Sequence, residues 1–313
     1  MSPDVLPSWR PGPTRDAVLG FLDDAQDLPV ERRLACFDND GTLWVERPTY
    51  VQWDFLVDAL RARAADDASL ADVPELAAVL VADRTAIADL GLPRVAVALN
   101  GLFAAITPET FTAAVRDFMS RAEHATLGRR LADCTYLPML ELMGELRARG
   151  FAVTISSGGG AEFVRAVSQA LYDIAPEAVV GTLVAYDYVP DAQGRPRLLR
   201  TPGLVGGANE GPTKVTNIQT QLGRRPCLAV GNSAGDREML DWALGSEGPS
   251  MALLLDHDDA EREVAYASVA GTFESAEPVL DLAERSGWTV VSMRRDWATV
   301  FADGPDLPSG WTT

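Results

Sequence analysis

Cysteine and histidine are both scarce in this chain of 313 residues, which holds three cysteines and two histidines. Cys36, Cys134 and Cys227 stand far apart, so they suggest neither a disulfide framework nor a CxxC metal site, and we expect unpaired thiols. His124 and His257 have no other metal-ligand residues nearby at a useful spacing. Zinc chemistry and a histidine phosphatase mechanism therefore receive little support.

Long apolar runs are missing as well. None approaches the ~20 residues that are needed to cross a bilayer, and the first residues lack the basic and apolar segments of a secretory signal. We therefore expect a cytoplasmic protein with no membrane partner.

Basic residues are few compared with acidic ones. The chain has 27 lysines and arginines against 45 aspartates and glutamates, a net charge of -18. Such a protein repels a polyanion and offers no basic stripe, so we expect no nucleic-acid partner. An acidic protein can still bind a small phosphorylated metabolite if a divalent cation or a few basic side chains reverse the charge locally.

The order of the apolar segments predicts an α/β fold. Short apolar runs predict strands, and several of the segments between them have the apolar spacing of helices. Strands are expected over 34–37, 151–156, 226–230, 251–255 and 288–292, with a hairpin over 179–189 and 195–199. Because strands and helices alternate, we expect a doubly wound, mostly parallel sheet.

Three regions follow from this pattern. The proline-rich residues 1–13 are expected to form a disordered N-terminal arm. Residues 14–47 and 134–313 are expected to form the α/β core. Residues 48–133 have leucine and alanine at helical spacing and no convincing strand, so we expect an all-helical domain inserted after the first strand.

A polar loop follows the first expected strand, with the sequence DNDGT at 38–42. Ligands bind at the carboxyl ends of strands in open α/β sheets, which makes this loop a candidate site. Asp38 and Asp40 can share a cation, and their oxygen atoms suit Mg²⁺. A calcium-binding EF-hand is excluded, because its first and twelfth ligand positions would be Cys36 and Arg47.

Three further polar segments lie at or beside the ends of expected strands. Ser157 precedes the glycines at 158–160, so a hydroxyl and backbone N–H groups converge where a phosphate oxygen could rest. Lys214 begins an expected helix after a glycine-rich stretch, and GNSAGD at 231–236 follows another strand. Each segment alone is an ordinary turn or helix start, but their order along the chain is far more specific.

In this order the four segments resemble the four motifs of the haloacid dehalogenase-like superfamily, over roughly residues 34–240. The helical insertion is similar to the C1-type cap of the phosphoserine phosphatase branch. The resemblance implies that Asp38 is a nucleophile that forms a phospho-aspartyl intermediate, and that Asp40 is the general acid and base. It also implies a phosphate-binding set that consists of Ser157, Gly158 and Lys214.

The fourth segment departs from the commoner pattern of the superfamily. Aspartates usually occupy the places of Asn232 and Asp236, and here the first is an asparagine. An asparagine carbonyl can ligate Mg²⁺ but brings no charge, so weaker binding is expected. The resemblance implies a Mg²⁺ site formed by Asp38, Asp40 and Asn232, with Asp236 either ligating directly or holding a metal-bound water.

Substrate choice is expected to lie in the helical insertion, which would close over the site. The candidate residues follow the first loop directly: Glu46, Arg47, Tyr50 and Trp53. The two aromatic residues can equally be helix core, and Arg47 can be a solvated charge. In phosphoserine phosphatases a glutamate in this region binds the amino group, and Glu46 is one residue short of that spacing.

The expected activity is Mg²⁺-dependent hydrolysis of a small phosphate monoester. One alternative is a phosphotransferase, in which Asp38 passes its phosphoryl group to an acceptor other than water. The other is a non-catalytic protein that binds a phosphorylated metabolite, with Asn232 as the hint. The presence of Asp38, Asp40 and Lys214 argues against this second alternative.

Overall fold

The computed structural model describes residues 5–268, 277–302 and 311. Its strands are β1 (Leu34–Phe37), β2 (Ala152–Gly160), β3 (Val179–Pro190), β4 (Pro196–Val205), β5 (Leu228–Gly231), β6 (Met251–Asp256) and β7 (Thr289–Ser292). Its α-helices are α1 (Pro13–Asp24), α2 (Val51–Asp66), α3 (Pro74–Leu80), α4 (Arg84–Leu90), α5 (Leu92–Gly101), α6 (Pro108–Arg121), α7 (Leu137–Ala148), α8 (Ala161–Tyr172), α9 (Pro212–Leu222), α10 (Arg237–Leu244), α11 (Val279–Ser286) and α12 (Met293–Asp296).

The strands form one seven-stranded sheet in the order β4-β3-β2-β1-β5-β6-β7. Every pairing is parallel except that of β3 with β4. Strands β2, β3 and β4 follow one another on one side of β1, and β5, β6 and β7 follow one another on the other side. This confirms the predicted doubly wound, mostly parallel sheet, and it places the point of reversal at β1, where α/β folds bind their ligands.

Strand β1 is buried on both faces, as its unbroken apolar sequence predicted. Ala35 and Phe37 face one hydrophobic cluster, which α1, α7 and α8 cover. Leu34 and Cys36 face a second cluster on the opposite side, which α9, α10 and α11 cover. Helices therefore cover both faces of the sheet, and the ends of its strands are left as the place for a functional site.

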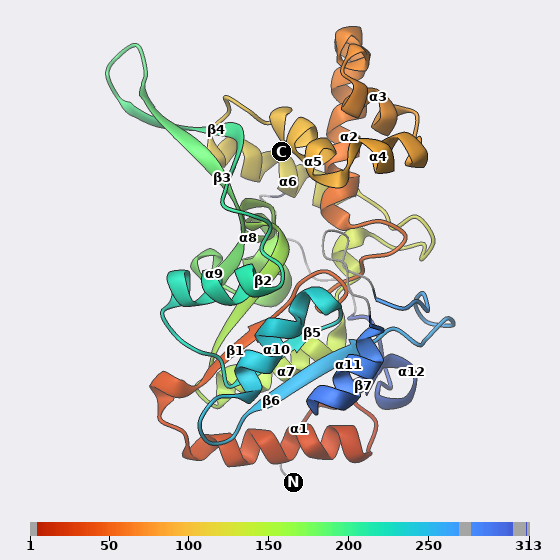
Figure 1. Ribbon diagram of the computed structural model, residues 1–313, viewed down its shortest axis with the longest axis vertical. Helices are drawn as coiled ribbons and strands as arrows, with labels where there is room; N and C mark the ends of the chain where they lie inside the picture. The colour runs from red at the N-terminus through yellow and green to blue at the C-terminus, as the bar shows by residue number, and fades with distance from the viewer. Residues whose placement is uncertain (1–4, 269–276, 303–310, 312–313) are drawn as a thin grey trace.

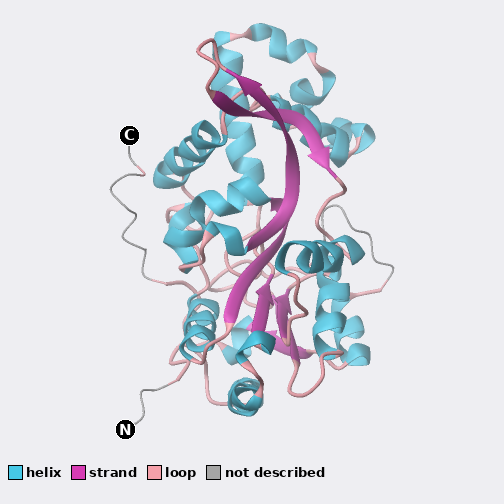
Figure 2. Ribbon diagram, turned by 90° about the vertical axis from the view of Figure 1, so that its left-hand side faces the viewer, coloured by secondary structure: helices cyan, strands magenta, loops and turns pink. Residues whose placement is uncertain are grey.

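Helices α2 to α6 lie together at one end of the molecule, above the sheet (Figure 1). The long hairpin of β3 and β4 extends from the sheet to these helices (Figure 2). Arg200 on β4 fixes this contact, because its guanidinium donates to Phe103 O at 3.1 Å and Asn100 Oδ1 at 2.9 Å. The expected hairpin is therefore confirmed, and β4 runs further than the sequence indicated.

The first residues differ from the expected disordered arm. Leu6 and Trp9 are each only 2% exposed, and the Trp9 indole donates to Pro138 O at 3.0 Å. The Trp9 ring also meets Trp297 edge to face, with ring centroids 6.3 Å apart. Apolar burial against distant parts of the chain therefore outweighs the local proline content. Residues 1–4 of the predicted arm lie outside the described residues.

The cysteines and the lengths of the helices also bear on the sequence-based expectations. The cysteines are all buried and unpaired, as their spacing predicted. Among the described residues, no helix combines the length and the apolar character that a membrane span requires.

Candidate active site

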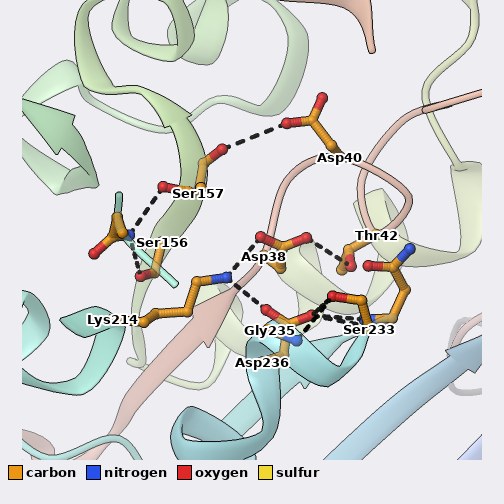
Figure 3. A network of polar contacts seen from close by, with 12 residues as sticks. Asp38, Asp40, Thr42, Ser156, Ser157, Lys214, Ser233, Gly235 and Asp236 are labelled. Carbon is orange, nitrogen blue, oxygen red and sulfur yellow. Dashed lines mark hydrogen bonds and ion pairs between the residues drawn. The ribbon is translucent and has the colours of Figure 1, made fainter. Parts of the chain in front are cut away.

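Segments that are far apart in the sequence meet at the carboxyl edge of the sheet (Figure 3). The Asp38 N–H donates to Val230 O at 2.8 Å, which ties the end of β1 to β5. Because β2 and β5 pair with β1 in parallel, Ser157 and Asn232 come to the same edge as Asp38. The predicted convergence of the first, second and fourth segments therefore has its origin in strand pairing.

Lys214 lies between two carboxylates at the centre of this group. Its ammonium donates to Asp38 Oδ1 at 2.8 Å and to Asp236 Oδ1 at 2.5 Å, and its side chain is only 2% exposed. Burial disfavours the charged amine, but the carboxylates of Asp236 and Asp38 overcome it and raise the pKa of Lys214. Lys214 is therefore a fixed cation beside Asp38.

Asp38 is a buried carboxylate that Lys214 compensates only in part. Burial first, and then the nearby charge of Asp236, raise the pKa of Asp38 well above its ordinary value. The second oxygen of Asp38 accepts only a long hydrogen bond, from Thr42 Oγ1 at 3.4 Å. The site therefore favours a further cation close to Asp38.

Asp236 holds the fourth segment together. It ends the short helix η6 (Ala234–Asp236), and its Oδ2 accepts from the N–H groups of Asn232 at 3.0 Å and Ser233 at 3.1 Å. Its other oxygen accepts from Lys214. Both oxygens of Asp236 are thus engaged with protein donors, while a role for Asp236 at the metal stays a prediction.

Asp40 has two partners that fix its carboxylate. The Trp44 indole donates to Oδ1 at 2.8 Å, and the Ser157 hydroxyl lies 3.5 Å from Oδ2, the limit of a hydrogen bond. Burial raises the pKa of Asp40, and the Trp44 hydrogen bond offsets part of this effect. A raised pKa favours the protonated form of Asp40, which is the form that a general acid needs.

Strand β2 runs on past the expected end at residue 156 through the glycines, and residues from several elements hold this glycine end. Gly159 N–H donates to Ser157 Oγ at 3.0 Å, and the Asn209 amide donates to Ser157 O at 2.9 Å and to Ser156 Oγ at 3.2 Å. Gln52 at the start of α2 accepts from Gly160 N–H at 2.8 Å. The glycine end of β2 therefore links the sheet to helix α2.

The sequence pattern of the haloacid dehalogenase-like hydrolase family matches residues 35–241, which is more than half of the chain and includes all four segments. The chain belongs to the haloacid dehalogenase-like hydrolase family. No curated protein matches it in sequence.

Solved structures resemble this family member in fold. A conserved, functionally unknown protein from Anaerococcus prevotii DSM 20548 has a TM-score of 0.56 at 14% identity, covering 90% of this chain and 94% of that one. A protein of unknown function from Bordetella pertussis Tohama I has a TM-score of 0.50 at 16% identity, covering 83% of this chain and 98% of that one. At such low identity these likenesses show the fold alone.

The four residues proposed to contact substrate have different surroundings in this hydrolase. Glu46 is 3% exposed, and its Oε1 accepts from Asn232 Nδ2 at 3.0 Å. Burial raises the pKa of Glu46 to about 7. The Arg47 guanidinium lies over the Tyr266 ring, 4.6 Å from its centroid. Tyr50 is half-buried just before α2, and Trp53 packs against the larger hydrophobic cluster.

Sequence reasoning missed several residues that support this site, among them Trp44, which bonds Asp40. Asn209 and Gln52 hold the glycine end of β2, and His257 Nε2 lies 2.7 Å from Gly41 O in the first loop. A carbonyl oxygen only accepts hydrogen bonds, so Nε2 carries the proton. His257 Nδ1 lies 3.1 Å from Oε2 of Glu263, whose side chain is buried. None of the contacts made by Asn209, Gln52 and His257 has a local sequence signal, because each joins separate elements.

The oxygen atoms at this edge fit a hard divalent cation. Asp38 needs compensation beyond Lys214, and within the described part of the chain no donor reaches Asn232 Oδ1. Carboxylate and amide oxygens are the ligand types that Mg²⁺ prefers. In the described ranges no three histidine, cysteine, aspartate or glutamate side chains are arranged to hold a metal by themselves. A cation here would therefore also use the Asn232 amide or backbone carbonyl oxygens.

Proposed function

We propose that this hydrolase is a Mg²⁺-dependent phosphatase that cleaves a small phosphate monoester through a phospho-aspartyl intermediate on Asp38. We place it in the phosphoserine phosphatase-like branch, with residues 48–133 as a C1-type helical cap on a core of residues 14–47 and 134–313. The observation that carries the proposal is the buried Lys214, which bonds Asp38 and Asp236 at the carboxyl edge of β1.

The first half of the reaction is attack on phosphorus by Asp38. Lys214 occupies Oδ1 of Asp38, which leaves Oδ2 for the new P–O bond as the ester P–O bond breaks. The leaving oxygen takes a proton from Asp40, whose raised pKa suits that step. Ser157, Gly158 and Lys214 would bind the phosphate oxygens.

The second half returns the enzyme to its starting state. Asp40, now ionised, accepts a proton from a water molecule, and the oxygen of that water attacks phosphorus. The bond between phosphorus and Asp38 breaks, and inorganic phosphate leaves. The hydrogen bond from Trp44 keeps Asp40 in one orientation for both proton transfers.

The cation would be held by oxygen atoms of Asp38, Asp40 and Asn232, with Asp236 close behind. When bound, Mg²⁺ offsets the repulsion between an anionic carboxylate and an anionic phosphate ester. Lys214 alone brings one positive charge against two carboxylates, so it cannot also neutralise a phosphate.

The test is hydrolysis of an aryl phosphate by the purified full chain with Mg²⁺ and with a chelator. The proposal predicts turnover that requires Mg²⁺ and is lost in the Asp38→Asn variant. Tight binding of phosphate esters without any turnover would instead identify a binding protein. Added alcohols test the remaining alternative, because a phosphotransferase would form new phosphate esters in place of free phosphate.

A further inference from the structure

We propose that Glu46 is a positioning residue for the Mg²⁺ site, which orients Asn232 and supplies the negative charge that this asparagine lacks. The inference rests on the proposed function, and it gives Glu46 a different task from the substrate contact that its position near the cap suggested.

The hydrogen bonds of Asn232 fix the direction of its side-chain amide. Nδ2 donates to Glu46 Oε1 at 3.0 Å and approaches Ser268 Oγ at 3.4 Å. This hydrogen bond places the nitrogen of the amide, and not its oxygen, against Glu46. Oδ1 therefore points away from Glu46, and no donor from the described residues occupies it. It is left as a free oxygen ligand.

The pair formed by Glu46 and Asn232 lies directly against the first loop. Gly41 has a φ of 72°, and a Cβ atom there would collide with the Asn232 amide and lie 2.8 Å from Glu46 Cδ. Glycine at this position thus lets both side chains approach the loop that carries Asp38 and Asp40. Glu46 and Asn232 are 3% and 1% exposed, so the solvent does not screen the contact.

Charge explains why such a pair is useful here. The usual aspartate of the family would give the cation both an oxygen ligand and a negative charge, whereas Asn232 gives only the oxygen. Glu46 places a carboxylate one hydrogen bond behind that ligand. Groups that hydrogen-bond to a metal ligand in this way also affect how tightly the site binds the metal. Together the two side chains have the charge of a single aspartate.

The experiment is a double-mutant cycle on the full chain, with binding of MgCl₂ alone measured by isothermal titration calorimetry. Glu46→Gln removes the charge and is expected to weaken Mg²⁺ binding about 10- to 100-fold. In an Asn232→Asp background the charge is already on residue 232, so Glu46→Gln should change the affinity less than about threefold. A residue with a merely structural role would not show this dependence on residue 232.

Controls keep the outcomes distinct. Glu247→Gln removes the same charge from a side chain that is 93% exposed, and it should leave Mg²⁺ affinity unchanged. Circular dichroism checks that every variant is folded. Equal loss of affinity on Glu46→Gln in both backgrounds, or no loss in either, overturns the inference. Aryl phosphate turnover that persists in the parent protein would show that the proposed function survives that result, whereas a parent that binds no Mg²⁺ contradicts both.

Discussion

Replacing Glu46 with glutamine should change how the stability of the metal-free protein depends on pH. Burial raises the pKa of Glu46 from 4.5 to about 7. The native state then binds this proton more tightly than the unfolded chain does between these two values. The free energy of unfolding therefore falls as the pH rises from 4.5 through 7, and the contribution of Glu46 levels off above that point.

The size of the effect follows from the pKa change. Each unit of difference between the native and unfolded pKa corresponds to about 1.4 kcal/mol. Ionising Glu46 therefore removes ~3 kcal/mol from the free energy of unfolding between pH 4.5 and pH 8. Glutamine stays neutral, so the Glu46→Gln variant lacks this loss. Relative to the parent, the variant should become more stable by ~3 kcal/mol over that range.

Urea unfolding followed by circular dichroism at pH 5, 6, 7 and 8 in a chelator measures this difference. Glu247→Gln is the matched control, since its exposed carboxylate should give a difference that hardly changes with pH. If the stability difference between the Glu46→Gln variant and the parent stays constant within about 0.5 kcal/mol across the range, burial of Glu46 does not act as described.

Three further predictions follow from individual contacts. Lys214→Met leaves two buried carboxylates without their cation and should lower the free energy of unfolding by about 3 to 5 kcal/mol, measured by urea unfolding. Asp40→Asn should slow aryl phosphate hydrolysis about 10²- to 10⁴-fold, while its melting temperature stays close to the parent value because an amide oxygen can still accept from the Trp44 indole. Gly41→Ala should lower the melting temperature more than Gly206→Ala does. Both glycines have positive φ, but only at Gly41 would a Cβ collide with neighbouring side chains, so equal losses would contradict the close packing.

Much of the fold could be predicted because its signals are local. The apolar run of β1 and the polar loop after it stand next to each other in the sequence, and strand pairing then brings Ser157 and Asn232 to the same edge. Several strand limits moved by only one or two residues, as for β6, expected over 251–255 and found at Met251–Asp256. The order of the four segments therefore contained most of the geometry of the site.

Contacts between distant elements could not be predicted in this way. The position of Glu46 directly after the first loop predicts a substrate contact, but it gives no sign of the hydrogen bond to Asn232, which lies 186 residues further along the chain. The same holds for Trp9, whose surroundings include Pro138 and Trp297. The contact of His257 with the first loop gave no signal, because the partner there is the backbone carbonyl of Gly41. Such pairings depend on the packed tertiary structure and not on residue type or spacing.

A rapid acid quench during turnover can trap the covalent bond that Asp38 is proposed to form with phosphorus. The full chain would be mixed with an aryl phosphate and Mg²⁺, quenched during turnover, digested and analysed by mass spectrometry. The account predicts a phosphoryl group on the peptide that contains Asp38, and neither adduct nor turnover in the Asp38→Asn variant. Full turnover in that variant, or a phosphoryl group found only on another residue, would contradict it.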